Sequence, residues 1–243
     1  MAKKTKTVQS KKDVKPARKR PLFSRLLRFL RNSVIVAVTA ATGLVFLFKA
    51  VNPPTSLYMM SEWWRLGGIE RDWTRFEGFP AYVPRSIVAA EDANFCLHSG
   101  FDFQQIQSAL MGKGRLRGAS TLSQQVSKNV FLWQGRSWLR KGLEAGFTVL
   151  LELIWSKRRI LEVYMNVAEF DDGVFGVAAA GRDYFKVEPE KITRLQAARL
   201  AAVLPNPKHR SASRPSNAVR KRTKQIISGA ETIAADGRAK CFQ

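Results

Sequence analysis

Cysteine and histidine are scarce in this chain, which has two of each among 243 residues. The two cysteines, Cys96 and Cys241, are too few for a disulfide framework, and neither has a partner at metal-ligand spacing. One bridge in an oxidising compartment and two free thiols both remain open. His98 has no second histidine nearby, so hydrogen bonds that orient another group suit it better than metal ligation.

Alternating polar and apolar residues, the pattern of a half-buried strand, do not run for any length, and internal repeats are absent. Apolar residues make up 45% of the chain and recur at helical spacing. The sequence therefore predicts a mainly α fold, with helices near 84–91, 101–110, 121–133, 137–167, 174–185, 193–204 and 216–235. We expect 147–155 to be the central buried part of the 137–167 helix, and 171–173 to be a turn.

Acidic residues are less than half as frequent as basic ones, 19 against 41, which gives a net charge of +22. Residues 1–31 hold twelve Lys or Arg against the single Asp13, so half of the excess lies in this segment. The other half is spread over the rest of the chain. Nucleic acid, an anionic membrane surface and a phosphorylated substrate are all open as counterparts.

The chain has one long uncharged apolar run near its start, Ser33–Phe48, flanked by Arg31 and Lys49. Its sixteen residues are fewer than the roughly 20 that a bilayer core needs, and snorkelling flanks supply the difference. We interpret 32–51 as an uncleaved transmembrane anchor, with the positive-inside rule placing residues 1–31 in the cytoplasm. A buried core helix and a cleaved signal peptide are the alternatives.

Five segments follow from these patterns. They are a basic tail (1–31), the anchor (32–51), a membrane-proximal segment (52–83), a catalytic core (84–207) and a basic C-terminal helix and tail (208–243). Pro53 and Pro54 end the anchor helix. Trp63 and Trp64 come next, and these aromatic residues are compatible with either the membrane interface or the protein core.

Polar and titratable groups gather inside the otherwise apolar stretch 91–129. Glu91 follows an apolar helix face, and burial there would raise its pKa and suit it to act as a general base. An exposed or capping Glu91–Asp92 pair is the simpler alternative. Ser120 or Thr121 is expected to cap the next helix, whose Leu122, Val126, Val130 and Trp133 would face the core.

Four cations fall within fourteen residues, at Lys128, Arg136, Arg140 and Lys141. Such a group can hold a pyrophosphate, although a solvated basic face is the alternative. For Glu144, four residues after Arg140, an exposed ion pair with that arginine is the simpler alternative. A glycosidase needs a carboxylic acid for its leaving group, whereas pyrophosphate leaves readily once cations neutralise it. One base and a cationic patch therefore favour glycosyl transfer from a lipid diphosphate over hydrolysis.

Five segments in order resemble the five motifs of the peptidoglycan glycosyltransferases. They are E-D-x-x-F-x-x-H-x-G at 91–100, G-x-S-T-x-x-Q-Q-x-x-K-N at 118–129, R-K-x-x-E at 140–144, K-x-x-I-L-E-x-Y-x-N at 157–166, and 199–207. The resemblance implies a mainly α, lysozyme-like fold. It also implies polymerisation of lipid II into glycan strands with inversion at the anomeric carbon.

By this resemblance Glu91 is the base that deprotonates the acceptor 4-hydroxyl, which attacks the donor MurNAc carbon and expels undecaprenyl pyrophosphate. Glu144 is the second essential carboxylate, and a divalent ion, Mg²⁺ or Mn²⁺, at the donor pyrophosphate is left open. The resemblance makes residues 101–117 a lip that dips into the membrane. Substrate binding is carried over to Asp92, Phe95, His98, Gly118, Ser120, Thr121, Gln124, Gln125, Lys128, Asn129, Arg136, Arg140 and Lys141.

No Ser-x-x-Lys sequence occurs, and only 36 residues follow Pro207, so the chain is most similar to the monofunctional family members of Gram-negative inner membranes. The implied partners are lipid II, the growing lipid-linked glycan and membrane lipid, with cell-wall or cell-division proteins left open and nucleic acid not expected. Lys186 departs from the family pattern, which usually has Gly there. A lytic enzyme on the same fold and a non-enzymatic basic membrane-anchored binding protein are the rival functions.

Overall fold

The computed structural model of this chain describes residues 22–111 and 120–243. It divides into two compact units, residues 1–43 and 44–243. The helix α1 (Leu22–Ala50) begins in the first unit and ends in the second. Its apolar side chains are largely exposed. The part from Phe23 to Ala50 is long and apolar enough to cross a membrane. This agrees with the expected anchor.

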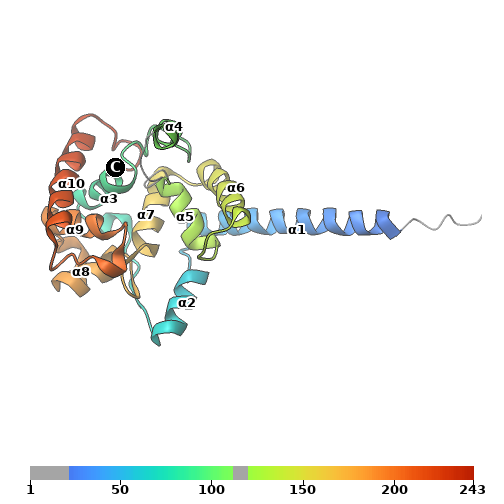
Figure 1. The fold of residues 1–243 in the computed structure, drawn as a ribbon, viewed down its shortest axis with the longest axis horizontal. Coiled ribbons are helices and arrows are strands. Elements are labelled where there is room, and N and C mark those ends of the chain that lie inside the picture. The colour runs from blue at the N-terminus through green and yellow to red at the C-terminus, as the bar shows by residue number, and fades with distance from the viewer. Residues whose placement is uncertain (1–21, 112–119) are drawn as a thin grey trace, which may run out of the picture. The chain divides into compact units, whose positions relative to one another are not determined.

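The second unit is mainly helical, as predicted (Figure 1). Helices α3, α9 and α10 pack against one another, and α5 packs against α6 and α7. Short 3₁₀ turns lie at Phe76–Gly78, Pro189–Lys191 and Pro207–His209. The helices are α2 (Leu57–Leu66), α3 (Tyr82–Glu91), α4 (Phe103–Met111), α5 (Leu122–Phe131), α6 (Trp138–Ile154), α7 (Lys157–Val167), α8 (Val177–Phe185), α9 (Arg194–Val203) and α10 (Asn217–Ala235).

The prediction of one helix over 137–167 is wrong, because the chain breaks between α6 and α7. Trp155 is extended, and the side chain of Ser156 accepts a hydrogen bond from the backbone N–H of Arg159, which starts a new helix. The indole N–H of Trp155 donates to the carbonyl oxygen of Val45 at 2.8 Å. A capping serine inside an otherwise helical pattern is therefore the signal that marks this boundary.

The central buried helix is α7, not the 147–155 stretch of α6. Every residue of α7 from Val163 to Val167 is buried, whereas Leu139 and Leu153 of α6 are 70% and 77% exposed. The 147–155 stretch is apolar on more than one face, so periodicity alone could not show which face is inside.

A small three-stranded sheet was not predicted. Its strands are β1 (Glu70–Arg71), β2 (Glu169–Asp171) and β3 (Val174–Phe175), in the order β1-β3-β2. Strand β3 is parallel to β1 and antiparallel to β2. Two or three residues are too few to show an alternating pattern. The predicted turn is correct, since Gly173 between β2 and β3 has a φ of 75°.

A disulfide joins Cys96 to Cys241 across 145 residues of sequence. It settles the question left open above in favour of one bridge. Cys96 lies in the loop after α3, five residues beyond Glu91, so the bridge ties the end of the chain to the loop that follows the predicted base.

We predict that replacing both cysteines with serine lowers the free energy of unfolding by about 3–5 kcal/mol, because a cross-link over so long a loop restricts the unfolded chain strongly. Urea unfolding of the detergent-solubilised chain, followed by tryptophan fluorescence, measures the change. Reductant should destabilise the wild type and leave the double variant unaffected. An unchanged wild-type transition in reductant would contradict the prediction.

Lys186, the C-cap of α8, has a φ of 56° and a ψ of 39°, the left-handed region that favours glycine. We predict that Lys186→Gly raises the stability by about 0.5–1 kcal/mol, since it removes the strain of a side chain in this conformation. Thermal unfolding measures the gain. Lys186→Ala keeps the strain and should give no gain, so an equal rise in the alanine variant would refute the explanation.

Candidate active site

Glu91 is the last residue of α3, and the buried Val83, Ile87 and Val88 of that helix hold it against the core. Its side chain is 12% exposed. Burial raises the pKa of Glu91 and the neighbouring Asp92 adds to the rise, while a hydrogen bond from Gln125 and the charges of Arg222 and Lys128 oppose it. A carboxylate with a raised pKa in a site of this kind suits general-base chemistry.

Gln125 of α5 holds one oxygen of Glu91. Its Nε2 donates to Oε2 of Glu91 at 3.0 Å. The hydroxyl of Tyr164 on the buried helix α7 donates to Oε1 of Gln125 at 3.2 Å. Because the ionised carboxylate of Glu91 only accepts hydrogen bonds, the N–H end of the Gln125 amide faces Glu91, and the amide oxygen is left to accept from Tyr164.

Arg222 of α10 is a neighbour of Glu91 that the sequence analysis missed. Its Nη2 lies 3.7 Å from Oε1 of Glu91 and donates to the carbonyl oxygen of Ala90 at 2.9 Å. Among the described residues, that Oε1 accepts no hydrogen bond although it is buried. In the sequence, Arg222 is one of several cations in a basic helix, and nothing there distinguishes it.

Glu144 of α6 is buried, with a relative exposure of 3%, so the simpler alternative of an exposed ion pair does not hold. One carboxylate oxygen accepts a hydrogen bond from Nη1 of Arg140 at 2.7 Å, and the other accepts one from Nζ of Lys141. The predicted third motif therefore forms a compact charged cluster in which both oxygens of Glu144 are engaged.

Lys128 of α5 interacts electrostatically with both Glu91 and Glu144. Burial lowers its pKa, Glu144 and Glu91 raise it, and Arg140 and Lys141 lower it further. Within 22–111 and 120–243, its ammonium group forms no hydrogen bond or ion pair. It lines a pocket of about 170 Å³, here called the Lys128 pocket, together with Tyr58, Gln125, Asn129, Tyr164 and Glu169.

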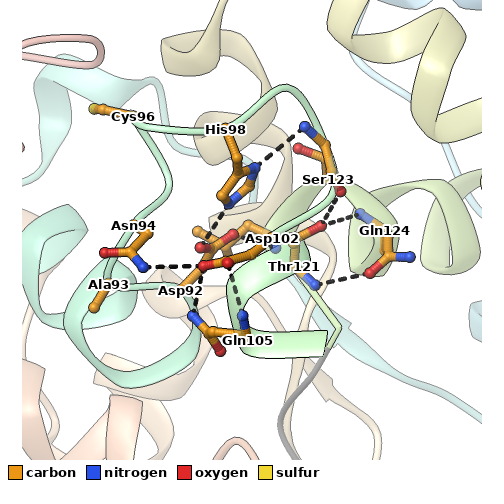
Figure 2. Close-up of polar contacts among 12 residues, drawn as sticks. Asp92, Ala93, Asn94, Cys96, His98, Asp102, Gln105, Thr121, Ser123 and Gln124 are labelled. Atoms are coloured by element: carbon orange, nitrogen blue, oxygen red, sulfur yellow. Dashed lines mark hydrogen bonds and ion pairs between the residues drawn. The ribbon is translucent and has the colours of Figure 1, made fainter. Parts of the chain in front are cut away.

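Asp92 and His98 join the loop after α3 to the start of α5 (Figure 2). Oδ1 of Asp92 lies 2.9 Å from Nε2 of His98, and Oδ2 accepts the backbone N–H of Leu122 at 3.0 Å. Nδ1 of His98 accepts the N–H of Gly100 at 3.2 Å. The ring proton is therefore on Nε2 and is donated to Asp92.

Thr121 and Gln124 form a capping box at the N-terminus of α5, which confirms Thr121 as the cap. Thr121 also donates to the carbonyl oxygen of Gly100 at 2.7 Å. Four buried residues thus fix the loop after α3 and the start of α5, namely Asp92, Phe95, Thr121 and Gln124. Trp133 lies past the end of α5 and is 40% exposed, so its predicted place in the core is wrong.

The remaining predicted residues are less closely grouped. Asn129 lines the Lys128 pocket, while Ser120 and Arg136 are exposed at either end of the segment that carries α5. Gly118 and residues 112–117 of the expected lip lie outside the described residues.

The residues at the predicted donor site do not form a donor set for Mg²⁺ or Mn²⁺, because both oxygens of Glu144 are engaged by cations. Two other clusters of potential metal ligands occur among the described residues, Asp92 with His98 and Asp102, and Glu62 with Glu169 and Asp172. In the first cluster, His98 is hydrogen-bonded to Asp92. In the other, Nζ of Lys208 lies 2.9, 3.5 and 3.1 Å from oxygens of Glu62, Glu169 and Asp172, in the place that a cation would take.

A family model described as "Transglycosylase" matches residues 60–231. The chain is 49% identical over 234 residues to a protein of Jannaschia sp. (strain CCS1) named "Biosynthetic peptidoglycan transglycosylase", covering 96% of this chain and 97% of that one. Proteins with the same name from Caulobacter vibrioides and Pseudomonas aeruginosa are 44% and 47% identical, over 88% and 85% of this chain and 96% and 91% of theirs.

We predict that Arg222→Met shifts the acid limb of the pH–rate profile of glycosyl transfer to higher pH. Arg222 lowers the pKa of Glu91, so its loss raises that pKa further, and a base is active only above its pKa. The logarithm of kcat/KM against pH measures the shift. Arg220→Met, on the exposed side of the same helix, should keep the wild-type limb. A uniform loss of rate at every pH in Arg222→Met would contradict the electrostatic role.

Proposed function

This chain belongs to the transglycosylase family and is a peptidoglycan glycosyltransferase, and we propose that it polymerises lipid II into glycan strands with inversion and release of undecaprenyl pyrophosphate. The predicted family and its mainly helical, lysozyme-like domain are confirmed. The observation that carries the proposal is that a buried carboxylate, with one oxygen that accepts no hydrogen bond, lies near a lysine that has no partner among the described residues.

Glu91 is the proposed base. Its Oε2 is held by Gln125, while its Oε1 accepts no hydrogen bond among the described residues and is free to take a proton. The acceptor 4-hydroxyl gives this proton to Oε1 as its oxygen forms a bond to the donor anomeric carbon. The bond from that carbon to the pyrophosphate oxygen breaks, and its electron pair leaves with the pyrophosphate. Attack from the face opposite the leaving group inverts the configuration.

Lys128 supplies the charge that stabilises the leaving pyrophosphate. A cation with no partner in 22–111 and 120–243 is ready to pair with a substrate anion, and its burial strengthens the interaction. Arg140 and Lys141 extend the positive region, and Glu144 holds both of them in place. The exposed Arg136, in the loop between α5 and α6, completes the proposed pyrophosphate site.

The lytic alternative fits the site less well. A glycosidase needs a carboxylic acid positioned to protonate its leaving group. The second buried carboxylate, Glu144, is ion-paired with Arg140 on one oxygen and Lys141 on the other, so a substrate oxygen would have to compete with two cations for it.

We place the catalytic unit outside the cytoplasm, at the inner membrane. The apolar N-terminal helix suggests a membrane anchor, and the basic residues before it favour a cytoplasmic N-terminus. The disulfide between Cys96 and Cys241 suits an oxidising compartment such as the periplasm. The exposed apolar side chains of α4 and α6 would then face the bilayer, namely Phe103, Met111, Trp138, Leu139 and Leu153.

We predict that Glu91→Gln abolishes polymer formation from labelled lipid II, with a loss of about 10²- to 10⁴-fold for a missing general base. Gel analysis of the glycan products measures the loss. Polymer made by this variant at the wild-type rate would rule out Glu91 as the base. Release of fragments from preformed glycan by the wild type would favour the lytic enzyme.

The same variant should not be less stable at neutral pH. The pKa of Glu91 is raised by burial, so the folded state binds its proton more tightly than the unfolded state. The stability that this gives is present below the ordinary pKa and is lost as the pH rises through the raised one. A neutral glutamine avoids that loss, and thermal unfolding of Glu91→Gln therefore separates lost catalysis from lost folding.

A further inference from the structure

We propose that Glu169 and Tyr58 form a subsite for the 2-acetamido group of the donor sugar, which would make them specificity-determining residues. The inference rests on the proposed function, since it takes the donor to be a lipid-linked N-acetylated sugar. Neither residue belongs to the groups that the sequence analysis assigned to the substrate.

The two residues stand in the Lys128 pocket. Lys128 and Asn129 of α5 line it, and so do Tyr58 of α2 and Glu169 of β2. Its volume of about 170 Å³ is enough to admit a small polar group. The pocket thus brings the membrane-proximal segment and the catalytic core together around a single substituent of the substrate.

The side chain of Glu169 is a buried carboxylate that can accept further hydrogen bonds. The hydroxyl of Tyr58 donates to Oε2, and the backbone N–H of Gly173 donates to Oε1 at 3.2 Å. A carboxylate can accept about four hydrogen bonds, so further N–H or O–H groups can be bound. Burial raises the pKa of this carboxyl, and a donor group from the substrate would stabilise the charged form.

The chemistry of the donor indicates which group enters the pocket. The pyrophosphate is attached to the anomeric carbon, and the acetamido group is on the adjacent ring carbon. A pyrophosphate at Lys128 therefore leaves the acetamido group as the substituent closest to the other residues of the pocket. Its N–H suits the Glu169 carboxylate, and its carbonyl oxygen suits the side-chain amide N–H of Asn129.

The structure also provides a matched control. Nζ of Lys208 lies 2.9 Å from Glu62 and 3.5 Å from Glu169, so both carboxylates belong to the same charged cluster. Glu62 of α2 is buried in that cluster but does not line the pocket. Loss of Glu62 therefore tests the cluster as a structural element, and loss of Glu169 tests the subsite as well.

The test compares two lipid-linked donors in the full-length protein in detergent, one natural and one with the 2-acetamido group of the donor sugar replaced by hydroxyl. We expect the wild type to prefer the natural donor by about 10- to 100-fold in kcat/KM, as a site built to hydrogen-bond a substrate group rejects an analogue without it. Glu169→Met should reduce that preference to near one. Tyr58→Phe, a milder change, should reduce it partly, and Glu62→Met should retain it.

An unchanged preference in both Glu169→Met and Tyr58→Phe would overturn the subsite, and so would an equal loss in Glu62→Met. Absence of polymer from the wild type with the natural donor would overturn the proposed function and the subsite with it. Polymer from the natural donor without any preference over the analogue would leave the function standing and overturn the subsite alone. Thermal unfolding of each variant excludes misfolding as the cause.

Discussion

The burial of a carboxylate at the end of α3 is the constraint on which the other features of the site depend. A buried charge is costly unless other groups compensate it. The compensation for Glu91 comes from Gln125 and Lys128 on α5 and from Arg222 on α10, two helices that are distant in sequence. The compensation is incomplete, since the pKa stays raised. The protein thus keeps a carboxylate that is ready to take a proton, and it needs the whole domain to do so.

The cations of the site are arranged in two different ways. Arg140 and Lys141 are paired with Glu144, so their positions are fixed before any substrate binds. Lys128 has no such partner among the described residues, and an anion that enters its pocket would complete the charge balance. The paired group gives rigidity, and in the proposed function the unpaired Lys128 would give affinity for an incoming diphosphate. The proposed subsite at Glu169 would add recognition of the sugar to recognition of the charge.

Local chemistry determines what could be predicted from the sequence. The cap at Thr121, the turn at Gly173 and most of the helices depend on neighbouring residues, and the structure has them where they were expected. The Arg222 contact, the Lys128 pocket and the disulfide join segments far apart in the chain, so no local pattern indicates them. The break at Ser156 was missed because helix-forming segments lie on both sides of it, and the capping role of a single serine between them was overlooked. The mistaken placing of 147–155 has another cause, since apolar character alone does not tell a buried face from an exposed one.

The contact between α3 and α10 also bears on when the protein becomes an enzyme. Arg222 donates to Ala90 across 132 residues of sequence, and the closure of so long a loop is slow compared with the formation of a helix or a hairpin. The proposed base therefore gains its guanidinium neighbour only when early and late segments of the domain have met. A chain still in synthesis or in transit across the membrane would hold the carboxylate without this neighbour. Catalytic competence is in this sense a property of the finished fold.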